Sequence, residues 1–129
     1  MDRRVRIQWT VTARDQLASI PQKVRRGILS KADMLLECEN PRTLFKALLG
    51  PLQGYFRIPY SRYRAIYSVV DEDLASGDIL ITVTVCFVTV GKRKAGDKRD
   101  VYRLAERLVK FGRLADREED MGDMIKCCG

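Results

Sequence analysis

The chain has 129 residues, of which 46% are hydrophobic and 32% charged, a composition typical of one globular domain. Its formal charge is +7, and it contains no histidine. A Ser-His-Asp triad, a Cys-His pair and an imidazole base are therefore excluded, so any proton transfer must use Lys, Tyr, Asp, Glu, Cys or water. No apolar run approaches the ~20 residues of a membrane helix and no signal peptide is evident, which predicts a cytoplasmic protein.

The positive charge is concentrated in the first 112 residues. Residues 113–129 hold three basic and five acidic residues, which leaves residues 1–112 with a charge of +9. This positively charged part of the chain, the basic body, favours a polyanionic partner, either nucleic acid or an acidic protein. We expect a globular domain over 1–112 and a C-terminal appendage over 113–129, where the periodicity is weak. The cysteine spacing matches no zinc site, and we expect neither a metal nor another cofactor.

The first forty residues predict one strand and two helices. Arg4–Trp9 alternates between polar and apolar residues, as in a half-buried strand. A capping-box variant at Thr12–Asp15 opens a helix over 13–20, and Pro21 begins a second helix over 22–39. Two helices joined so closely are expected to form an antiparallel hairpin that packs on the sheet.

The middle of the chain predicts three strands and the end of the domain predicts a helix. Tyr55–Tyr60 and Tyr63–Val70 are rich in aromatic and β-branched residues. An acidic turn over 71–78 leads to Ile79–Val90, the longest strand pattern in the chain. Hairpin-length connections make these three strands antiparallel. A helix over 100–110 completes the domain.

The order β-α-α-β-β-β-α predicts an α+β fold: a single twisted, mostly antiparallel four-stranded sheet with a helical hairpin on one face. We expect all three helices to cover the same face and to leave the other face open. There Arg57 and Arg64 would project from adjacent strands, with Arg93 where the next strand ends. Paired guanidiniums on rigid strands suit a phosphate group.

Several short motifs then add a family resemblance. They are Lys46–Gly50, Gly54–Ile58, Arg62–Tyr67, Val90–Arg93 and Asp100–Tyr102. In this order and spacing they resemble the RelE/ParE superfamily of type II toxins, most closely its RelE branch, over about residues 5 to 110. The resemblance implies a RelE-like fold and an mRNA interferase, an endoribonuclease that needs no metal and uses the 2′-hydroxyl of ribosome-bound message for in-line attack. It also implies that Arg57, Arg64, Arg93 and Tyr102 are catalytic.

Further basic residues are expected to bind RNA phosphates around this site: Lys46, Arg62, Lys92, Lys94, Lys98 and Arg99. In-line cleavage of RNA requires cations for the charge that develops on the phosphoryl oxygens, and a tyrosine can stack on a base or assist a proton transfer. The resemblance implies an acidic cognate antitoxin as protein partner, with mRNA and the ribosome as targets. It implies no membrane contact and a monomeric free toxin.

Two positions depart from the RelE pattern. Arg57 stands where a lysine is typical, and Pro59 stands where a second lysine is a favoured general base. Arginine stays protonated and is a poor base, so Lys46 and Lys92 remain as candidates and the general base is left open. Two alternatives follow from other classes: a ParE-like toxin that poisons DNA gyrase, and a non-catalytic module that only binds an antitoxin.

Overall fold

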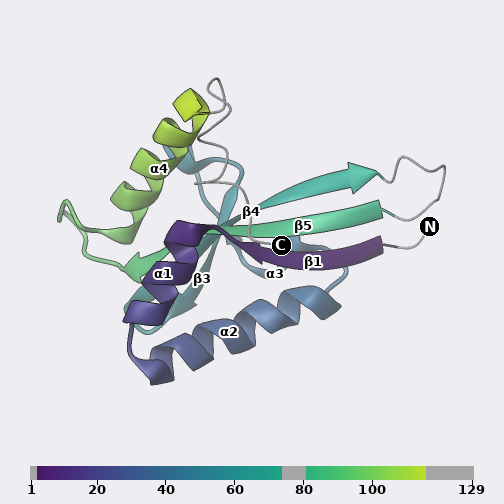
Figure 1. The fold of residues 1–129 in the computed structure, drawn as a ribbon, viewed down its shortest axis with the longest axis horizontal. Helices are drawn as coiled ribbons and strands as arrows, with labels where there is room; N and C mark the ends of the chain where they lie inside the picture. The colour runs from purple at the N-terminus through teal and green to yellow at the C-terminus, as the bar shows by residue number, and fades with distance from the viewer. Residues whose placement is uncertain (1–2, 74–80, 116–129) are drawn as a thin grey trace.

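The computed structural model describes residues 3–73 and 81–115, and it shows an α+β fold with helices on both faces of one sheet (Figure 1). The helices are α1 (Val11–Ser19), α2 (Gln22–Glu37), α3 (Pro41–Leu44) and α4 (Val101–Ala115), and a 3-10 turn, η1, spans Gly50–Leu52. The strands are β1 (Arg3–Trp9), β2 (Lys46–Ala47), β3 (Tyr55–Tyr60), β4 (Tyr63–Asp73) and β5 (Ile81–Lys92). The expected fold class is confirmed.

The sheet has five strands in the order β1-β5-β4-β3-β2, one more than expected. The additional strand is β2, which pairs with β3 at the edge and has only two residues, too few to show a periodicity. All neighbours are antiparallel except β1 and β5, which run parallel. β4 continues to Asp73, into the turn expected over 71–78. The remainder of that turn and the expected strand start at Ile79 lie outside the described residues.

The N-terminal helices lie on one face of the sheet, as expected. Thr10 caps α1: its Oγ1 accepts a hydrogen bond from the Ala13 N–H at 3.0 Å and donates one to the Val88 carbonyl at 3.3 Å. The helix therefore begins at Val11, two residues earlier than predicted. α1 contacts β5 chiefly, whereas α2 contacts β1 and β3. The two helices diverge from the turn between them (Figure 1).

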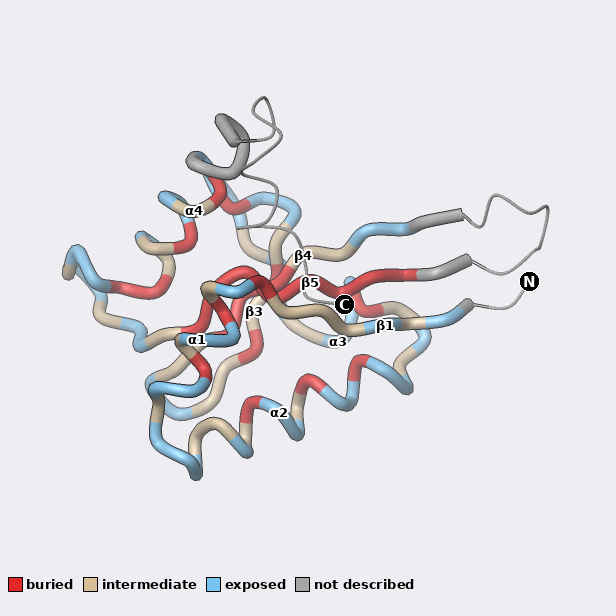
Figure 2. Tube along the Cα trace, in the orientation of Figure 1, coloured by how far each residue is buried: buried red, intermediate tan, exposed pale blue. Residues whose placement is uncertain are grey.

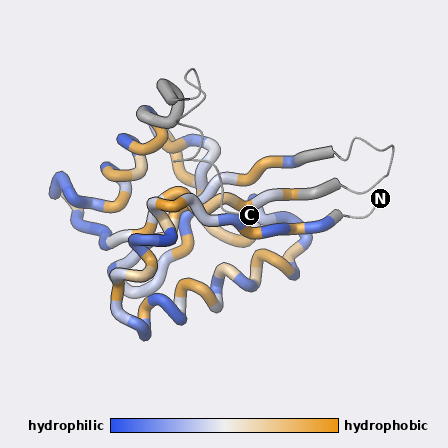
Figure 3. Tube along the Cα trace, viewed as in Figure 1, coloured by the Kyte–Doolittle hydropathy of each residue, from blue (hydrophilic) through white to orange (hydrophobic). Residues whose placement is uncertain are grey.

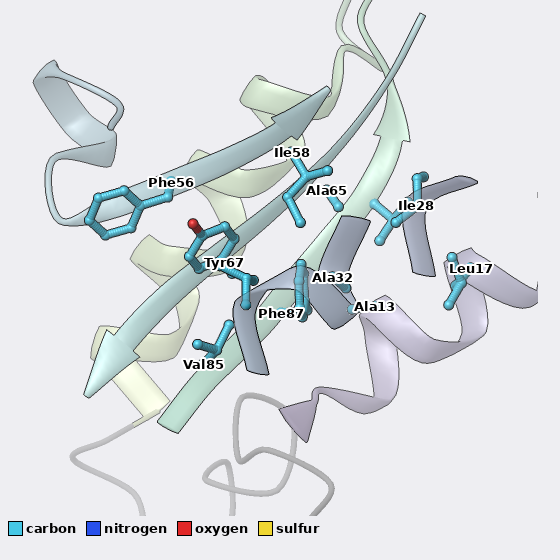
Figure 4. Packing of buried hydrophobic residues seen from close by; sticks show 12 residues of the cluster. Ala13, Leu17, Ile28, Ala32, Phe56, Ile58, Ala65, Tyr67, Val85 and Phe87 are labelled. Atoms are coloured by element: carbon cyan, nitrogen blue, oxygen red, sulfur yellow. The ribbon is translucent and has the colours of Figure 1, made fainter. Parts of the chain in front are cut away.

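The main core fills the space between these helices and the sheet (Figures 2 and 4). Its aromatic members overlap: Tyr67 stacks on Phe56 with ring centroids 5.4 Å apart, and Phe87 stacks on Trp9 at 4.1 Å. Such pairs add about 0.5–1.5 kcal/mol beyond their area burial. The buried members are Ala13, Leu17, Ile28, Ala32, Leu35, Phe56, Ile58, Ala65, Tyr67, Val85, Phe87 and Val90.

A β-bulge in β5 changes which face its side chains occupy. Ile66 pairs with Thr89 and Tyr67 pairs with Phe87, which leaves Val88 as the extra residue. Phe87 and Val90 consequently face the same core although they are three positions apart. The Gln16 side chain on α1 supports the bulge, because its Oε1 accepts hydrogen bonds from Thr89 Oγ1 and Val90 N, both at 2.9 Å.

α4 packs on the opposite face of the sheet, so the expectation that all helices share one face is wrong. Its residues Val101, Ala105 and Val109 form a second core with η1, β4 and β5. The full set of buried residues is Leu52, Ile66, Cys86, Val88, Val101, Ala105 and Val109. Apolar spacing along a helix identifies a buried stripe, but it does not say which face of a sheet the stripe covers. α4 continues to Ala115, and most of the expected appendage over 113–129 lies outside the described residues.

Candidate active site

A hydrogen bond between β3 and α4 forms the centre of the site. Arg57 Nη1 donates to the phenolic oxygen of Tyr102 at 3.2 Å across 45 positions of sequence, and both residues are half-buried. Arg57 reaches the α4 side because its strand neighbours Phe56 and Ile58 are buried in the main core. Tyr102 follows the buried Val101 on the helix and lies at the edge of the second core. The face that the sequence analysis expected to be open is therefore partly covered by α4, and Arg57 lies beside that helix.

Arg64 lies on β4, on the same face of the sheet as Arg57. It is two residues before Ile66, the residue directly opposite Arg57. Arg57 is opposite Ile66 and Arg64 is opposite Pro59, a diagonal relation with Cα atoms about 7–8 Å apart. Arg64 Nη1 donates to the carbonyls of Ser61 at 3.0 Å and Tyr63 at 2.8 Å. Its Nε is buried and has no hydrogen-bond partner among the described residues. The backbone thus brings the two arginines together, while each guanidinium contacts a different partner.

Arg93 is held at the same end of the sheet by a backbone contact. Its N–H donates to the carbonyl of Arg62 in the β3–β4 turn at 2.7 Å, and both side chains are exposed. Ser61, in that turn, has φ of 53°, the left-handed conformation typical of a tight turn. The end of β5 and the turn that carries Arg64 therefore form one edge.

Lys46 lies directly opposite Arg57 in the β2–β3 register, and its side chain is exposed. Directly opposed residues of antiparallel strands point to the same face, with Cβ atoms about 4.5–5.5 Å apart. Lys46 is therefore beside Arg57, placed there by a strand that the sequence analysis did not predict.

Lys92 does not join this group. It pairs with Tyr63 across β4 and β5, and its Nζ lies 5.7 Å from the centroid of the Tyr63 ring. The Tyr63 ring packs against the main core, on the α1 and α2 side of the sheet. The structure therefore places Lys92 on the face opposite Arg57.

The basic loop between β5 and α4 carries the other three predicted RNA-binding residues, and it appears as the blue segment before α4 in Figure 3. Lys98 and Arg99 are exposed and Lys94 is half-buried. Arg99 forms an ion pair with Asp97 at 3.6 Å, and the hydrogen bond from the Arg99 N–H lowers the pKa of the Asp97 carboxyl. The loop is thus an ordered series of turns rather than an extended basic segment.

Sequence reasoning missed two residues that fix this loop. Asp100 is buried, and its carboxylate accepts hydrogen bonds from the backbone N–H groups of Lys94 and Tyr102. Arg107 Nη2 donates to the carbonyl of Lys98 at 2.7 Å. An aspartate immediately before a helix is a recognisable capping signal, whereas nothing in the local sequence marks Arg107.

Within residues 3–73 and 81–115, no group of three or more His, Cys, Asp or Glu side chains is arranged to hold a metal ion. In the same part of the chain, no helix is both long enough and apolar enough to cross a membrane.

No family model and no curated protein matches the sequence. Solved structures do. The toxin–antitoxin complex RelBE2 of Mycobacterium tuberculosis matches at 25% identity and a TM-score of 0.54, over 70% of this chain and 99% of that one. A free Escherichia coli RelE mutant, in which two arginines are replaced by alanine, matches at 23% identity and a TM-score of 0.57, over 81% of this chain and 94% of that one. The chain has the RelE-like toxin fold.

Within the RelE-like fold, the structure brings together most of the residues that the sequence singled out. Arg57 and Tyr102 are in contact, and Arg64 and Arg93 lie at the same end of the sheet. Lys46 and Arg62 join them through the β2–β3 register and the β3–β4 turn. The remaining basic residues lie in the loop before α4, except Lys92, which lies on the other face of the sheet.

Proposed function

We propose that this chain is the toxin of a type II toxin–antitoxin system and that it is an mRNA interferase acting on ribosome-bound message. The RelE-like fold supports the first part. The contact between Arg57 and Tyr102 carries the second, because it brings together, across 45 positions of sequence, two of the residues that the RelE resemblance implies are catalytic. Among the described residues the half-buried Arg57 has no carboxylate partner, so no neighbouring anion in that part of the chain offsets the positive charge that it offers to a phosphate.

The chemistry proposed is in-line attack of an RNA 2′-hydroxyl on the adjacent phosphorus. Arg57, Arg64 and Arg93 supply positive charge to the phosphoryl oxygens as negative charge develops there. Tyr102 stacks on a nucleobase of the RNA or donates a proton to the leaving oxygen. Its hydrogen bond with Arg57 orients the phenol. The 2′-hydroxyl proton passes to a base, the O2′–P bond forms, and the bond from phosphorus to the 5′-oxygen breaks.

Lys46 is the base that this geometry favours. A lysine can lose its proton, whereas an arginine cannot, and Lys46 is the lysine that lies opposite Arg57. Pro59, which replaces a lysine of the RelE pattern, leaves β3 without such a group. The edge strand β2 supplies it from the neighbouring position.

The proposed protein partner is an acidic antitoxin that covers this face of the basic body. A charge of +9 over residues 1–112 favours such a partner electrostatically. Binding should weaken steeply as salt increases from about 0.05 M to 0.5 M, because the charges involved are exposed and screened. An affinity that does not change with salt would contradict this mode of binding.

The test is cleavage in a purified translation system that contains one defined message, with primer extension to locate the cuts. The full chain is expected to cut the message at ribosomes, whereas Arg57→Ala is not. If no cuts appear but DNA supercoiling by gyrase is inhibited, the ParE-like alternative is correct. If neither activity appears and an antitoxin still binds, the chain is a binding module.

A further inference from the structure

The carboxylate of Asp100 connects two parts of the candidate site. It is buried, with 6% of its surface exposed, and it is located between the basic loop and the first turn of α4. Oδ1 accepts a hydrogen bond from the Lys94 N–H at 2.5 Å, and Oδ2 accepts one from the Tyr102 N–H at 3.0 Å. Each oxygen thus holds the backbone of a different segment.

These two bonds complete a continuous series of contacts through the site. The Arg93 N–H, one residue before Lys94, is bound to the Arg62 carbonyl in the β3–β4 turn. Tyr102, at the other end, is bound through its side chain to Arg57 on β3. Asp100 therefore links the start of the loop, next to Arg93, directly to the Tyr102 N–H, whereas the other side-chain bond between this loop and α4, from Arg107 to the Lys98 carbonyl, touches neither residue.

Capping of α4 alone does not explain this arrangement. A helix cap needs one side-chain oxygen for an N–H in the first turn, and the bond to Tyr102 fulfils that need. The second oxygen bonds an N–H six positions earlier, outside the helix. Asp97 offers the contrast: its carboxylate accepts from the Arg99 N–H, and its backbone N–H donates to the Lys94 carbonyl, but among the hydrogen bonds of the described residues its carboxylate holds neither the Lys94 N–H nor the Tyr102 N–H.

We propose that Asp100 is a positioning residue of the site, which fixes the distance between Arg93 and Tyr102 so that both can act on one phosphate. The inference rests on the proposed function. Asp100 does not reach substrate itself, and its carboxylate takes no part in proton transfer. A displacement of about 1 Å in a catalytic group can cost on the order of 10²-fold in rate, so the link affects catalysis more than binding.

The experiment compares three full-length variants, Asp100→Ala, Asp100→Asn and the matched control Asp97→Ala. The asparagine keeps the shape and the cap but retains a single acceptor oxygen, so it can hold only one of the two N–H groups. Amide hydrogen exchange is measured by NMR, and thermal unfolding confirms that each variant is folded. Single-turnover cleavage of ribosome-bound message, over a range of toxin concentrations, separates the maximal rate from the half-saturating concentration.

In Asp100→Ala, faster exchange is expected for the backbone amides of both Lys94 and Tyr102, and in Asp100→Asn for one of the two. In Asp97→Ala, only the amide of Arg99 should exchange faster. The maximal rate should fall on the order of 10²-fold in Asp100→Ala and less in Asp100→Asn, with the half-saturating concentration little changed. When Asp100→Ala is added to Tyr102→Phe, the further loss of maximal rate should be smaller than in the wild-type chain, because both substitutions impair the action of Tyr102.

Two results would overturn the positioning role. One is unchanged exchange at Lys94 and Tyr102 in folded Asp100→Ala. The other is cleavage by Asp100→Ala at the rate of Asp97→Ala. A wild-type chain that cuts no message would instead refute the proposed function, and the exchange data would still decide whether Asp100 fixes the loop to the helix.

Discussion

Lys46 and Arg57 face each other across the β2–β3 pair, on the side of the sheet where Arg57 donates to Tyr102. This places a lysine of the edge strand β2, an arginine of β3 and a tyrosine of α4 on the same side of the sheet. Lys92, the other lysine considered as a base, faces Tyr63 on the opposite side. The two lysines therefore provide a test in which the same substitution is made on the two faces of one sheet.

We expect Lys46→Gln to slow message cleavage by about 10²–10⁴-fold, the range typical of a general base. Lys92→Gln removes the same charge from the other face and should leave the rate nearly unchanged. Single-turnover cleavage at saturating toxin is the measurement. Equal losses in the two variants would show that charge alone matters and that Lys46 is not the base.

Arg64→Ala is expected to abolish growth inhibition. Its guanidinium is held near the site by strand β4, and removal of one donor aimed at a transition-state charge typically costs about 10²–10³-fold in rate. Lys94→Ala serves as the control, because it removes a cation from the loop but keeps the N–H that binds Asp100. Both variants should remain folded and bind the antitoxin. Full toxicity of Arg64→Ala at equal expression would contradict the site.

Gly27 on α2 is expected to be intolerant of a side chain. A Cβ at this position would overlap the ring of Tyr60 on β3, so Gly27→Ala should lower the free energy of unfolding by about 1–3 kcal/mol. In a Tyr60→Ala background the same change should instead stabilise by about 0.5–1 kcal/mol, because alanine is the better helix former. Urea denaturation measures both values. The same sign in both backgrounds would exclude this steric cause.

Stability should decline at alkaline pH through Tyr67. Burial raises the pKa of this phenol above its usual value, and its hydroxyl donates to the Pro41 carbonyl at 2.9 Å. Above about pH 10 the phenol ionises in the unfolded chain but stays neutral in the folded one. The unfolded state then binds fewer protons, so the free energy of unfolding falls as pH rises.

Tyr67→Phe is the matched variant for that prediction. It should cost about 0.5–1.5 kcal/mol at neutral pH, where the hydrogen bond to Pro41 is lost, and it should be less sensitive to pH above 10. Urea denaturation at pH 7 and above pH 10 compares the two chains. An identical alkaline decline in both would assign the effect to other groups.

The strands could be predicted because their patterns are local. Phe56 and Ile58 alternate with Tyr55 and Arg57, and the burial of β3 follows that alternation. The face of α4 could not be predicted in this way, because it depends on Ile66, Val88 and Leu52, which are distant in sequence. The bulge at Val88 was missed for the same reason: it becomes visible only once β4 provides a partner register.

The relative placement of the candidate residues could be predicted on the long strands, but not at the short edge strand or in the loop before α4. Arg57 and Arg64 follow from alternation along β3 and β4. Lys46 required a two-residue strand, and Asp100 required the course of a loop that no periodicity describes. The directions of guanidiniums are set by hydrogen bonds, as in the contacts of Arg64 with Ser61 and Tyr63, and strand patterns carry no such information.

The parallel pairing of β1 with β5 determines when this chain can fold during its synthesis. Thr10, directly after β1, bonds to Val88 across 78 positions, so the first strand has no partner until most of the chain exists. Pairings this distant make folding slow, because a long loop must close before the contact forms. The growing chain carries the apolar sides of α1 and α2 without a complete sheet to cover them. The first third of the protein therefore completes its packing only once β5 has been made.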